Sequence, residues 1–490
     1  MNTDVAVSAG QVHAQMLIGG SRVDSTSRLE VRNPARTEEV VGTIVRGTPA
    51  DVDNAVAAAK AAQPGWAAKT FVQRAEALSR ALDKLGEDID ERAKIFVREN
   101  GKTFAEAKRE LSDVAARARF TLELAPELDA ANEMASPDGR TFVRRVPFGV
   151  VVSIGPWNAP VSLACMQIIP ALLTGNSVVL KAPESCPLAL IRTAEAIAAE
   201  LPDGLLNVVT GLPGEIGDAL TTHPDVSKIG FTGSIPSARK IIANAAQTIK
   251  SVTAELGGND PAIVLEDADL SDESMQRMAT IVFRMSGQVC MAIKRIYVAE
   301  SIHDQFVEAF GKAVERIVVG DGLVPAVSMG PLHTRAGFER ALEIIADAEL
   351  HGGKVMRLGR INDPDSFEHG YFIQPTVVTD VAETSRLVLE EQFCPVIPII
   401  RFKTVDAAVA SANATIFGLG GSVWSRDIEK ALAIAARIEA GTVFVNTHGT
   451  NSVNRKAPYG GLKQSGSGRR AGIEGLHEYT QSQTLTTYER

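Results

Sequence analysis

The chain has 490 residues, of which 45% are hydrophobic and 22% are charged. This composition is ordinary for a globular enzyme, and the length exceeds what one compact core holds, so roughly two to four domains are expected. A formal net charge of -9 offers no basic surface that would attract phosphate backbones, which argues against a nucleic-acid partner.

The first ten residues contain no Lys or Arg, and no apolar stretch of signal-peptide length follows them. We therefore expect a cytoplasmic protein. Three of the four cysteines, Cys165, Cys186 and Cys394, fit reduced and buried small apolar side chains. Because no Cys-x-x-Cys pair and no metal-type spacing of the eight histidines occurs, neither a disulfide framework nor a metal site is predicted.

The region before Gly149 is predicted to begin with short strands near 17–18 and 29–32. Alanine-rich helices are expected after them, near 51–62 and 72–89. No internal repeat or low-complexity segment is present.

No charged residue occurs between Val146 and Leu180, a stretch long enough to suggest a membrane span. Several Gly and Pro residues interrupt it, and a lipid-exposed helix broken so often would leave backbone amides unpaired. We interpret the stretch as folded interior, with a strand at 149–154, a helix at 160–173 and a strand at 177–181. This order is the parallel crossover unit, and no membrane association is expected.

The same alternation continues to residue 255. Helices are expected at 188–199, 214–221 and 236–245, and strands at 206–210, 228–232 and 251–255. The pattern predicts a doubly wound parallel sheet, in which ligands bind beyond the carboxyl ends of the strands. The residues expected at those ends are Asn158, Lys181, Gly233, Ser234 and Glu255.

A boundary is expected at Gly257, Gly258 and Pro261, followed by a second alternation. Its expected strands lie at 262–265 and near 371–378, 396–402 and 442–445, and its expected helices near 272–285, 302–315 and 334–351. We interpret this part as a second α/β domain with Cys290 near its start. The segments 140–146 and 480–488 resemble exposed strands, which either pair with another subunit or form a hairpin solvated on one face.

Two reactive side chains stand beside glycines. Cys290 ends the run Ser286-Gly287-Gln288-Val289-Cys290, and Glu255 begins the run Glu255-Leu256-Gly257-Gly258-Asn259. A thiol provides a covalent nucleophile and a carboxylate provides a base that releases the covalent product. The pairing suggests thioester chemistry.

Seven motifs between about residues 19 and 487 make the chain resemble the aldehyde dehydrogenase superfamily. They are Pro156-Trp157-Asn158, Lys181-Ala182-Pro183-Glu184, Gly230-Phe231-Thr232-Gly233-Ser234, Glu255-Leu256-Gly257-Gly258, Gly287-Gln288-Val289-Cys290, Glu391-Gln392-Phe393 and Pro458-Tyr459-Gly460-Gly461. Each motif alone is weak, but seven in order are specific. CoA-acylating relatives generally lack the glutamate at position 255, so a hydrolytic member that releases a free acid is implied.

The resemblance implies an α/β, aldehyde dehydrogenase-like fold, with two doubly wound parallel-sheet domains and a small β oligomerisation element. Its expected parts are a Rossmann-like NAD-binding domain (1–126 and 148–256), a catalytic domain (257–450), oligomerisation strands (127–147 and 476–490) and a segment returning near the active site (451–475). A homodimer or homotetramer is expected.

The same resemblance implies that the Asn158 amide and the Cys290 backbone N–H stabilise an oxyanion formed on an aldehyde carbon. It also implies a nicotinamide dinucleotide as the cofactor; NAD is favoured because Glu184 would repel a 2′-phosphate, and NADP stays open as the alternative. The implied cofactor-binding residues are Ile154, Pro156, Trp157, Lys181, Glu184, Gly214, Phe231, Gly233, Ser234, Leu256, Glu391 and Phe393.

Four positions depart from the family pattern. Gln167 and Arg470 replace the Lys and Glu of an ion pair in many relatives, so the route of protons to solvent is expected to differ. Ala238 and Cys394 each stand where glycine is usual.

The implied substrate pocket is apolar and adaptable, and Ala159 widens it where relatives often have an aromatic residue. Its expected residues are Ala159, Leu163, Met166, Arg284, Met285, Val289, Met291 and His448. These residues favour an apolar, aromatic or terpenoid aldehyde. Arg284 leaves open a carboxylated, succinate-semialdehyde-like aldehyde, although Met166 occupies the position of a second carboxylate-binding arginine.

Two other classes of function stay open. A cysteine hydrolase would also use an activated thiol, but it would need a histidine partner, and none lies near Cys290 in the sequence. A non-catalytic protein on the same scaffold would be expected to lose Cys290 or Glu255, and both are present.

Overall fold

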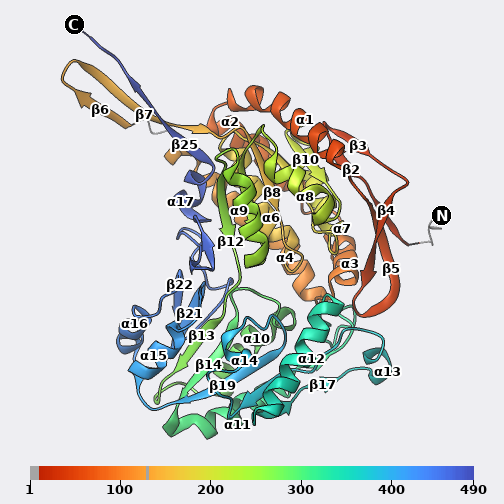
Figure 1. Cartoon of the computed structure of the whole chain (residues 1–490), viewed down its shortest axis with the longest axis vertical. Helices are drawn as coiled ribbons and strands as arrows, with labels where there is room; N and C mark the ends of the chain where they lie inside the picture. Colours follow the sequence, from red (N-terminus) through yellow and green to blue (C-terminus); the bar gives the residue numbers. More distant parts are fainter. Residues whose placement is uncertain (1–9, 129–131, 490) are drawn as a thin grey trace.

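The computed structural model describes residues 10–128 and 132–489. In Figure 1 the protein has an upper and a lower half, each built around one mainly parallel sheet, and a thin arm projects from the upper half. Within the described residues, no helix combines the length and the apolar composition that a membrane span requires.

The upper sheet has eight strands, of which the central five run parallel. In spatial order they are β24 (Gly466–Ser467), β12 (Ser251–Glu255), β11 (Val226–Thr232), β8 (Val150–Ile154), β9 (Ser177–Lys181), β10 (Leu206–Val209), β2 (Met16–Ile18) and β3 (Ser21–Val23). The chain runs from β8 to β9 and β10 on one side, and then to β11 and β12 on the other. The topological switch point, where such sheets bind ligands, therefore lies at the ends of β8 and β11.

Helices cover both faces of the upper sheet, because its central strands are apolar on both faces. One face packs on α1 (Pro49–Ala67), α8 (Pro213–Thr222) and α9 (Ile235–Ala246). The other face packs on α6 (Pro160–Leu173) and α7 (Leu188–Ala198), with α2 (Phe71–Lys84), α3 (Ile89–Asn100), α4 (Phe104–Glu123) and α5 (Ala125–Leu128) in the same core.

The lower sheet has seven strands and is parallel except for its edge strand β16. In spatial order they are β16 (Lys354–Arg357), β18 (Thr376–Thr379), β19 (Val396–Phe402), β14 (Ile293–Ala299), β13 (Asp260–Val264), β21 (Gly420–Trp424) and β22 (Thr442–Val445). One face packs on α10 (Asp272–Phe283) and α11 (His303–Val314), and the other on α12 (Arg335–Leu350), α14 (Arg386–Leu389), α15 (Val405–Asn413) and α16 (Ile428–Ala435).

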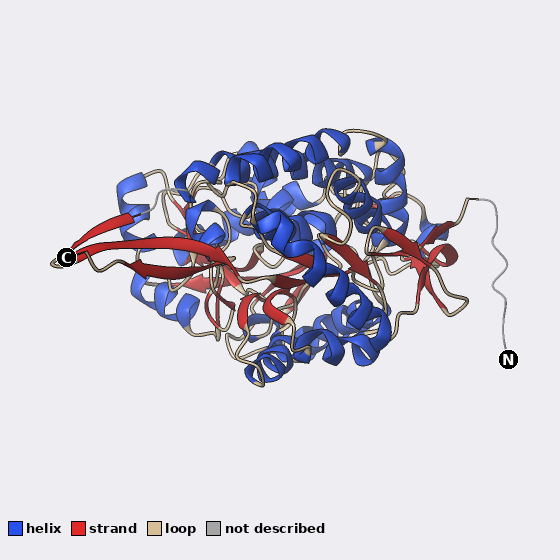
Figure 2. Cartoon of the chain, turned by 90° about the horizontal axis from the view of Figure 1, so that it is seen from above, coloured by secondary structure: helices blue, strands red, loops and turns tan. Residues whose placement is uncertain are grey.

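The arm is a three-stranded antiparallel sheet in the order β25 (Thr480–Thr486), β7 (Gly139–Pro147) and β6 (Asn132–Ser136). Figures 1 and 2 both show it projecting away from the body of the protein. The remaining elements are β1 (Val12–Ala14), β5 (Arg36–Val45), β4 (Arg28–Asn33), β15 (Val318–Val319), β17 (Arg360–Ile361), β20 (Phe417–Gly418), β23 (Leu462–Lys463), α13 (Pro364–Phe367) and α17 (Gly472–His477).

The predicted architecture of two doubly wound, mainly parallel sheets with a small β element is confirmed. The single helix predicted at 72–89 is wrong. Helix α2 ends earlier, at Lys84, and a turn at 85–88 follows it; Asp88, with a left-handed φ of 51°, then precedes the start of α3 at Ile89. The helix predicted near 272–285 ends at Phe283, shortly before Met285, which has a φ of 50°.

Candidate active site

Asn158 lies in the loop between β8 and α6, at the switch point of the upper sheet. Its side-chain Nδ2 donates a hydrogen bond to the Gln288 carbonyl at 2.9 Å, and its own carbonyl accepts one from Lys102 Nζ at 3.1 Å. The amide carries two N–H groups, so one donor remains beside the loop that holds Cys290. The upper and lower halves are thus joined directly at the predicted oxyanion donor.

The turn before Cys290 has an unusual backbone. Met285 and Ser286 have φ angles of 50° and 57°, and Gly287 follows with 73°. Left-handed non-glycine residues cost roughly 1–3 kcal/mol each and persist where surrounding contacts fix them. Here the Ser286 hydroxyl donates to the Gly330 carbonyl at 2.8 Å, which is one such contact. The thiol therefore stands on a fixed turn.

The Cys290 thiol is only partly exposed to solvent. Burial raises its pKa to about 12, and the nearby carboxylates of Glu391, Asp260 and Glu255 act in the same direction. In the unliganded protein the thiol is therefore neutral at pH 7.

Glu255 is the last residue of β12 and is almost completely buried, with 3% relative exposure. Neither of its carboxylate oxygens has a hydrogen-bond partner among the described residues. Burial raises its pKa to about 7, although Arg470 and Arg469 oppose this shift through their positive charges. The carboxylate therefore titrates near neutrality, as a general base for water requires.

Gln167 and Arg470, the two positions that depart from the family pattern, contact each other. Both are buried, and Arg470 Nη2 donates to the Phe231 carbonyl at 3.0 Å. In the amide orientation that satisfies both of its ends, Gln167 accepts from Arg470 Nη2 at 3.2 Å and donates to the Gly230 carbonyl at 2.8 Å. A neutral amide and a cation thus replace the expected ion pair, and the cation acts on Glu255.

A cavity of about 420 Å³ lies next to these groups, within the size range of small-molecule sites. Asn158 and Cys290 line it, and so do six of the eight predicted pocket residues, Ala159, Leu163, Met166, Arg284, Met285 and Val289. None of the predicted cofactor-binding residues lines this cavity. The structure therefore keeps the two predicted sets of residues apart.

Met291 and His448 do not line the cavity, contrary to the predicted pocket. Met291 is 1% exposed and packs in a core cluster with Leu419, Phe444 and Tyr459, against which Cys290 also packs. His448 is also buried, and its Nε2 lies 3.1 Å from Asp260 Oδ2. Its imidazole is thus held by a buried carboxylate and does not face the substrate mouth.

Helix α4 forms a wall of the cavity that sequence analysis missed. The lining residues on it are Ala105, Glu106, Arg109, Glu110, Asp113, Val114, Arg117, Ala118, Phe120 and Thr121. Most of them recur at intervals of three and four residues, which is the signature of one helix face. That pattern is visible in the sequence, but it does not say what the face covers.

The predicted nucleotide residues lie at the ends of β9 and β11. Lys181 is buried and its Nζ binds Glu184 Oε2 at 2.6 Å, which makes the pair more enclosed than an ordinary surface ion pair. Ser234 caps α9, with its hydroxyl accepting from the Ser237 N–H at 3.4 Å. The first turn of α9 offers N–H groups and the positive end of the helix dipole, which suit a pyrophosphate.

Glu391, Trp157 and Phe393 lie at the junction of the two halves. Glu391 is buried, its Oε1 accepts from the Gly258 N–H at 3.1 Å, and burial raises its pKa to about 7. The Trp157 ring stacks on His333 at 4.6 Å, and Phe393 packs edge-on against Trp157 at 5.6 Å. Aromatic side chains from both halves thus pack together at this junction.

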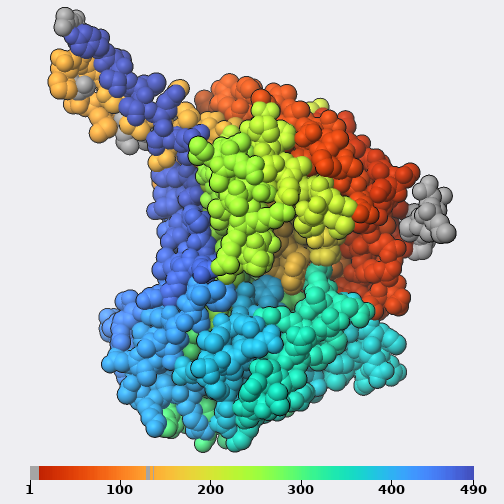
Figure 3. All heavy atoms as spheres, viewed as in Figure 1, coloured from red at the N-terminus to blue at the C-terminus, as the bar shows by residue number. Residues whose placement is uncertain are grey.

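The other predicted cofactor residues lie around the same edge. Ile154 and Phe231 are register partners of β8 and β11, and Pro156 follows Ile154 in the same loop. The Leu256 N–H donates to the Ser465 carbonyl at 2.9 Å. Gly214 stands in the first turn of α8 with open space next to its Cα. Figure 3 shows a hollow between the segment that contains α9 and the segment that contains α12.

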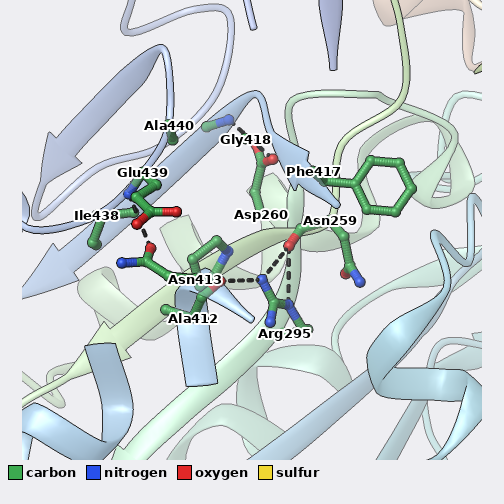
Figure 4. A pocket seen from close by; sticks show the side chains of 12 residues that line it. Asn259, Asp260, Arg295, Ala412, Asn413, Phe417, Gly418, Ile438, Glu439 and Ala440 are labelled. Carbon is green, nitrogen blue, oxygen red and sulfur yellow. Dashed lines mark hydrogen bonds between the residues drawn. The ribbon is translucent and has the colours of Figure 1, made fainter. Parts of the chain in front are cut away.

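A second pocket, behind the glycines that follow Glu255, is too small for a ligand, at about 10 Å³ (Figure 4). In it Arg295 donates to the Asn259 carbonyl at 2.7 and 2.9 Å, and Asp260 Oδ1 accepts from the Gly420 N–H at 3.0 Å. These buried bonds hold the segment that connects the two halves.

Comparison with known proteins gives one consistent family. Residues 22–485 match the sequence model of the aldehyde dehydrogenase family. An NADP dependent enzyme of E. coli is 33% identical, with 97% of this chain and 98% of that chain covered and a TM-score of 0.92. A betaine aldehyde dehydrogenase of Staphylococcus aureus in complex with NAD+ is 33% identical (97% and 94% covered, TM-score 0.91), and a lactaldehyde dehydrogenase of Escherichia coli is 31% identical (98% and 100% covered, TM-score 0.91).

Proposed function

Because the chain belongs to the aldehyde dehydrogenase family, we propose that it oxidises an aldehyde to its carboxylic acid, with Cys290 as the nucleophile and Glu255 as the base. The observation that carries this proposal is the position of Cys290 and Asn158 on one cavity, with the buried, unpaired carboxylate of Glu255 near enough for its charge to reach Cys290. The test is NADH absorbance with a panel of aldehydes, with one acid formed per NADH. A cysteine hydrolase would form acid from esters without NADH.

In the first step, Cys290 attacks the aldehyde carbon as the thiolate, after its proton has passed to solvent, and forms a thiohemiacetal whose oxygen carries negative charge. The free N–H of the Asn158 amide and the Cys290 backbone N–H are the donors for that oxygen. Each such donor is worth on the order of 3 kcal/mol of barrier. The bond from Asn158 to Gln288 at 2.9 Å fixes the amide before substrate binds, so no reorganisation is needed.

The residues at the carboxyl ends of the strands fit a nicotinamide dinucleotide. Lys181 and Glu184 would hold the adenosine ribose, the start of α9 the pyrophosphate, and Glu391 the second ribose. When bound, the oxidised nicotinamide supplies the two-electron acceptor and a positive charge that favours the Cys290 thiolate over the neutral thiol. The family uses NAD or NADP, and we propose NAD for this chain because Glu184 disfavours a 2′-phosphate.

Loss of a hydride from the thiohemiacetal carbon to the bound cofactor would leave an acyl thioester on Cys290. In the second step, Glu255 takes a proton from water, which attacks the acyl carbon and releases the free acid and the Cys290 thiolate. A pKa of about 7 leaves a large fraction of Glu255 ionised at neutral pH. The same value keeps the carboxylate basic enough to accept a proton.

We expect Glu184→Gln to raise kcat/KM for NADP about tenfold, because it removes a negative charge from beside the 2′-phosphate and leaves Lys181 free to bind it. The kcat/KM for NAD should fall several-fold, since the carboxylate that accepts hydrogen bonds from the adenosine ribose is lost. Initial rates with both nucleotides measure this, with Glu195→Gln on α7 as the control. An unchanged ratio of the two kcat/KM values would remove Glu184 from the nucleotide site.

We expect Arg470→Met to move the acidic limb of the steady-state rate to higher pH. Arg470 lowers the pKa of Glu255, so without that cation the carboxylate binds its proton more tightly and is ionised only at higher pH. The rate at pH 6.5 should fall several-fold, and the rate at high pH should stay the same. Arg470→Lys keeps the positive charge, so its acidic limb should lie at the same pH as that of the wild type. A uniform loss of rate at every pH would indicate a structural role.

We also propose that the arm pairs with another subunit, giving a homodimer or homotetramer. Its outer side chains include Leu485 and Tyr488, which are 43% and 63% exposed and apolar enough to favour contact with a second chain. Sedimentation velocity measures this, and a monomer at micromolar concentration would contradict it. The domain boundaries and the cytoplasmic location expected from the sequence stay predictions.

A further inference from the structure

The outer wall of the 420 Å³ cavity carries a cluster of positive charge, although the chain as a whole has a net charge of -9. Arg117 on α4, Arg284 after α10 and Arg455 in the loop before Tyr459 all line this one cavity. We call these three residues the arginine cluster. They come from three different segments of the chain, so their convergence is a property of the fold and not of one basic stretch.

The guanidinium groups of the arginine cluster have almost no partners in the protein. Arg284 Nη1 reaches only the Thr450 hydroxyl, at 3.5 Å. Arg117 Nη2 lies 4.0 Å from Asp113 Oδ2, the limit of an ion pair. No described residue forms an ion pair or hydrogen bond with the Arg455 side chain. Guanidinium groups that converge in this way present N–H donors in the geometry that binds carboxylate and phosphate groups.

The other acidic groups of this wall are engaged elsewhere. Glu110 binds Lys102 Nζ at 2.5 Å and accepts two backbone N–H groups at the start of α6. Glu106 caps α4 by accepting from the Thr103 N–H at 2.9 Å and also accepts from the Met285 N–H at 2.8 Å. Neither carboxylate forms an ion pair with the arginine cluster, although the charge of Glu110 acts on Arg117 from a distance.

Repulsion between the three positive charges also indicates that the arginine cluster needs an anion. Burial holds the pKa of Arg117 below its ordinary value, and the charges of Arg455 and Arg284 add to that effect against the opposing charges of Asp113 and Glu110. A bound anion would offset part of the free-energy cost of keeping Arg117 charged in this position.

Part of the cavity wall is apolar, although the charged residues Glu106, Arg109, Glu110 and Asp113 of α4 also line it. The apolar part comes from the packed helices α4 and α6, which lie next to each other in Figure 1. The apolar lining residues are Val114, Ala118, Leu163, Met166, Ile169 and Pro170. Lys102, which binds the Asn158 carbonyl, lies two residues before the first residue of α4, and Arg117 lies in the last two turns of that helix. A rise of 1.5 Å per residue places these two ends of the wall roughly 20 Å apart.

We propose that the substrate is an aldehyde with an apolar body that ends in a carboxylate, which the arginine cluster binds while the carbonyl reaches Cys290. This inference rests on the function proposed above and names its substrate class. The apolar wall binds the chain or ring, and the arginines bind the anion at the far end. The length of the wall favours a medium or long ω-oxo acid over a four-carbon semialdehyde.

The test compares ω-oxo acids of four to twelve carbons with their methyl esters and with n-alkanals of equal length, by steady-state NADH formation. The esters keep the length and remove the charge. We expect kcat/KM for the medium or long acids to exceed that for their esters by at least tenfold, mainly through KM. Arg117→Gln and Arg284→Gln should each lower kcat/KM for the acids tenfold or more, with little change for the esters. Arg119→Gln, on the same helix but paired with Asp83 outside the cavity, is the control.

Three outcomes would overturn the inference. Equal kcat/KM for acids and esters in the wild type shows that the charge is not recognised. Equal losses for acids and esters in the variants show a structural effect. Fastest turnover of the four-carbon acid shows that the length argument is wrong. In all three cases the alkanals are still oxidised, whereas failure of the proposed function leaves no NADH formation with any of these aldehydes.

Discussion

Cys290→Ala is expected to abolish aldehyde oxidation, with a loss of more than about 10⁴-fold in kcat, because no covalent adduct can form without the sulfur. Among the described residues, two cysteines line the cavity, Cys165 and Cys290, and of these only Cys290 is partly exposed. NAD binding should persist, since none of the predicted nucleotide residues changes. NADH formation and calorimetric titration with NAD measure the two effects separately.

The matched control is Cys394→Ala. Cys394 is buried and close to the Cys290 turn, but it does not line the cavity. Its replacement should leave oxidation within a few-fold of wild type. Alkylation adds a second measurement, because a thiol with a pKa of about 12 reacts slowly at pH 7, and bound NAD should accelerate the reaction. Oxidation by Cys290→Ala at near wild-type rate would refute the nucleophile.

The parts of the fold that the sequence predicted best are those where one physical signal dominates. In the uncharged stretch before Leu180, the predicted bounds of α6 and β9 agree with the observed bounds. Glycine and proline mark the ends of these elements in the sequence. The strand that ends at Glu255 was equally clear. By contrast, the break at 85–88 between α2 and α3 includes one left-handed residue, Asp88, and propensity alone does not reveal it.

The site was predictable where position along a strand determines it, and not where it depends on which segments meet. Asn158 and Glu255 follow strand ends, so their shared edge follows from topology. The contact between Gln167 and Arg470 joins α6 to a loop near the C-terminus, and no local pattern announces it. The exclusion of His448 has the same origin, because its partner Asp260 is distant in the sequence.

Glu255→Gln is expected to separate the two halves of the reaction. The amide cannot remove a proton from water, so hydrolysis of the thioester should slow by about 10²- to 10³-fold, the usual worth of a general base. Attack by Cys290 does not use Glu255 in the proposed mechanism, so one NADH per subunit should still form. Stopped-flow absorbance should show a burst of that amplitude followed by slow turnover, and mass spectrometry of the quenched enzyme should find the acyl group on Cys290.

The pH dependence gives an independent measure of the same residue. Glu255 acts as a base only when ionised, so wild-type turnover should rise as the pH passes through about 7, the pKa to which burial raises this carboxylate. Glu255→Gln should lose that acidic limb, whereas Glu266→Gln, a surface control paired with Lys430, should keep it. Two results would contradict the assignment. Steady-state turnover by Glu255→Gln at the wild-type rate would show that hydrolysis needs no carboxylate at this position. The absence of a burst in this variant would show that Glu255 is required before the thioester forms.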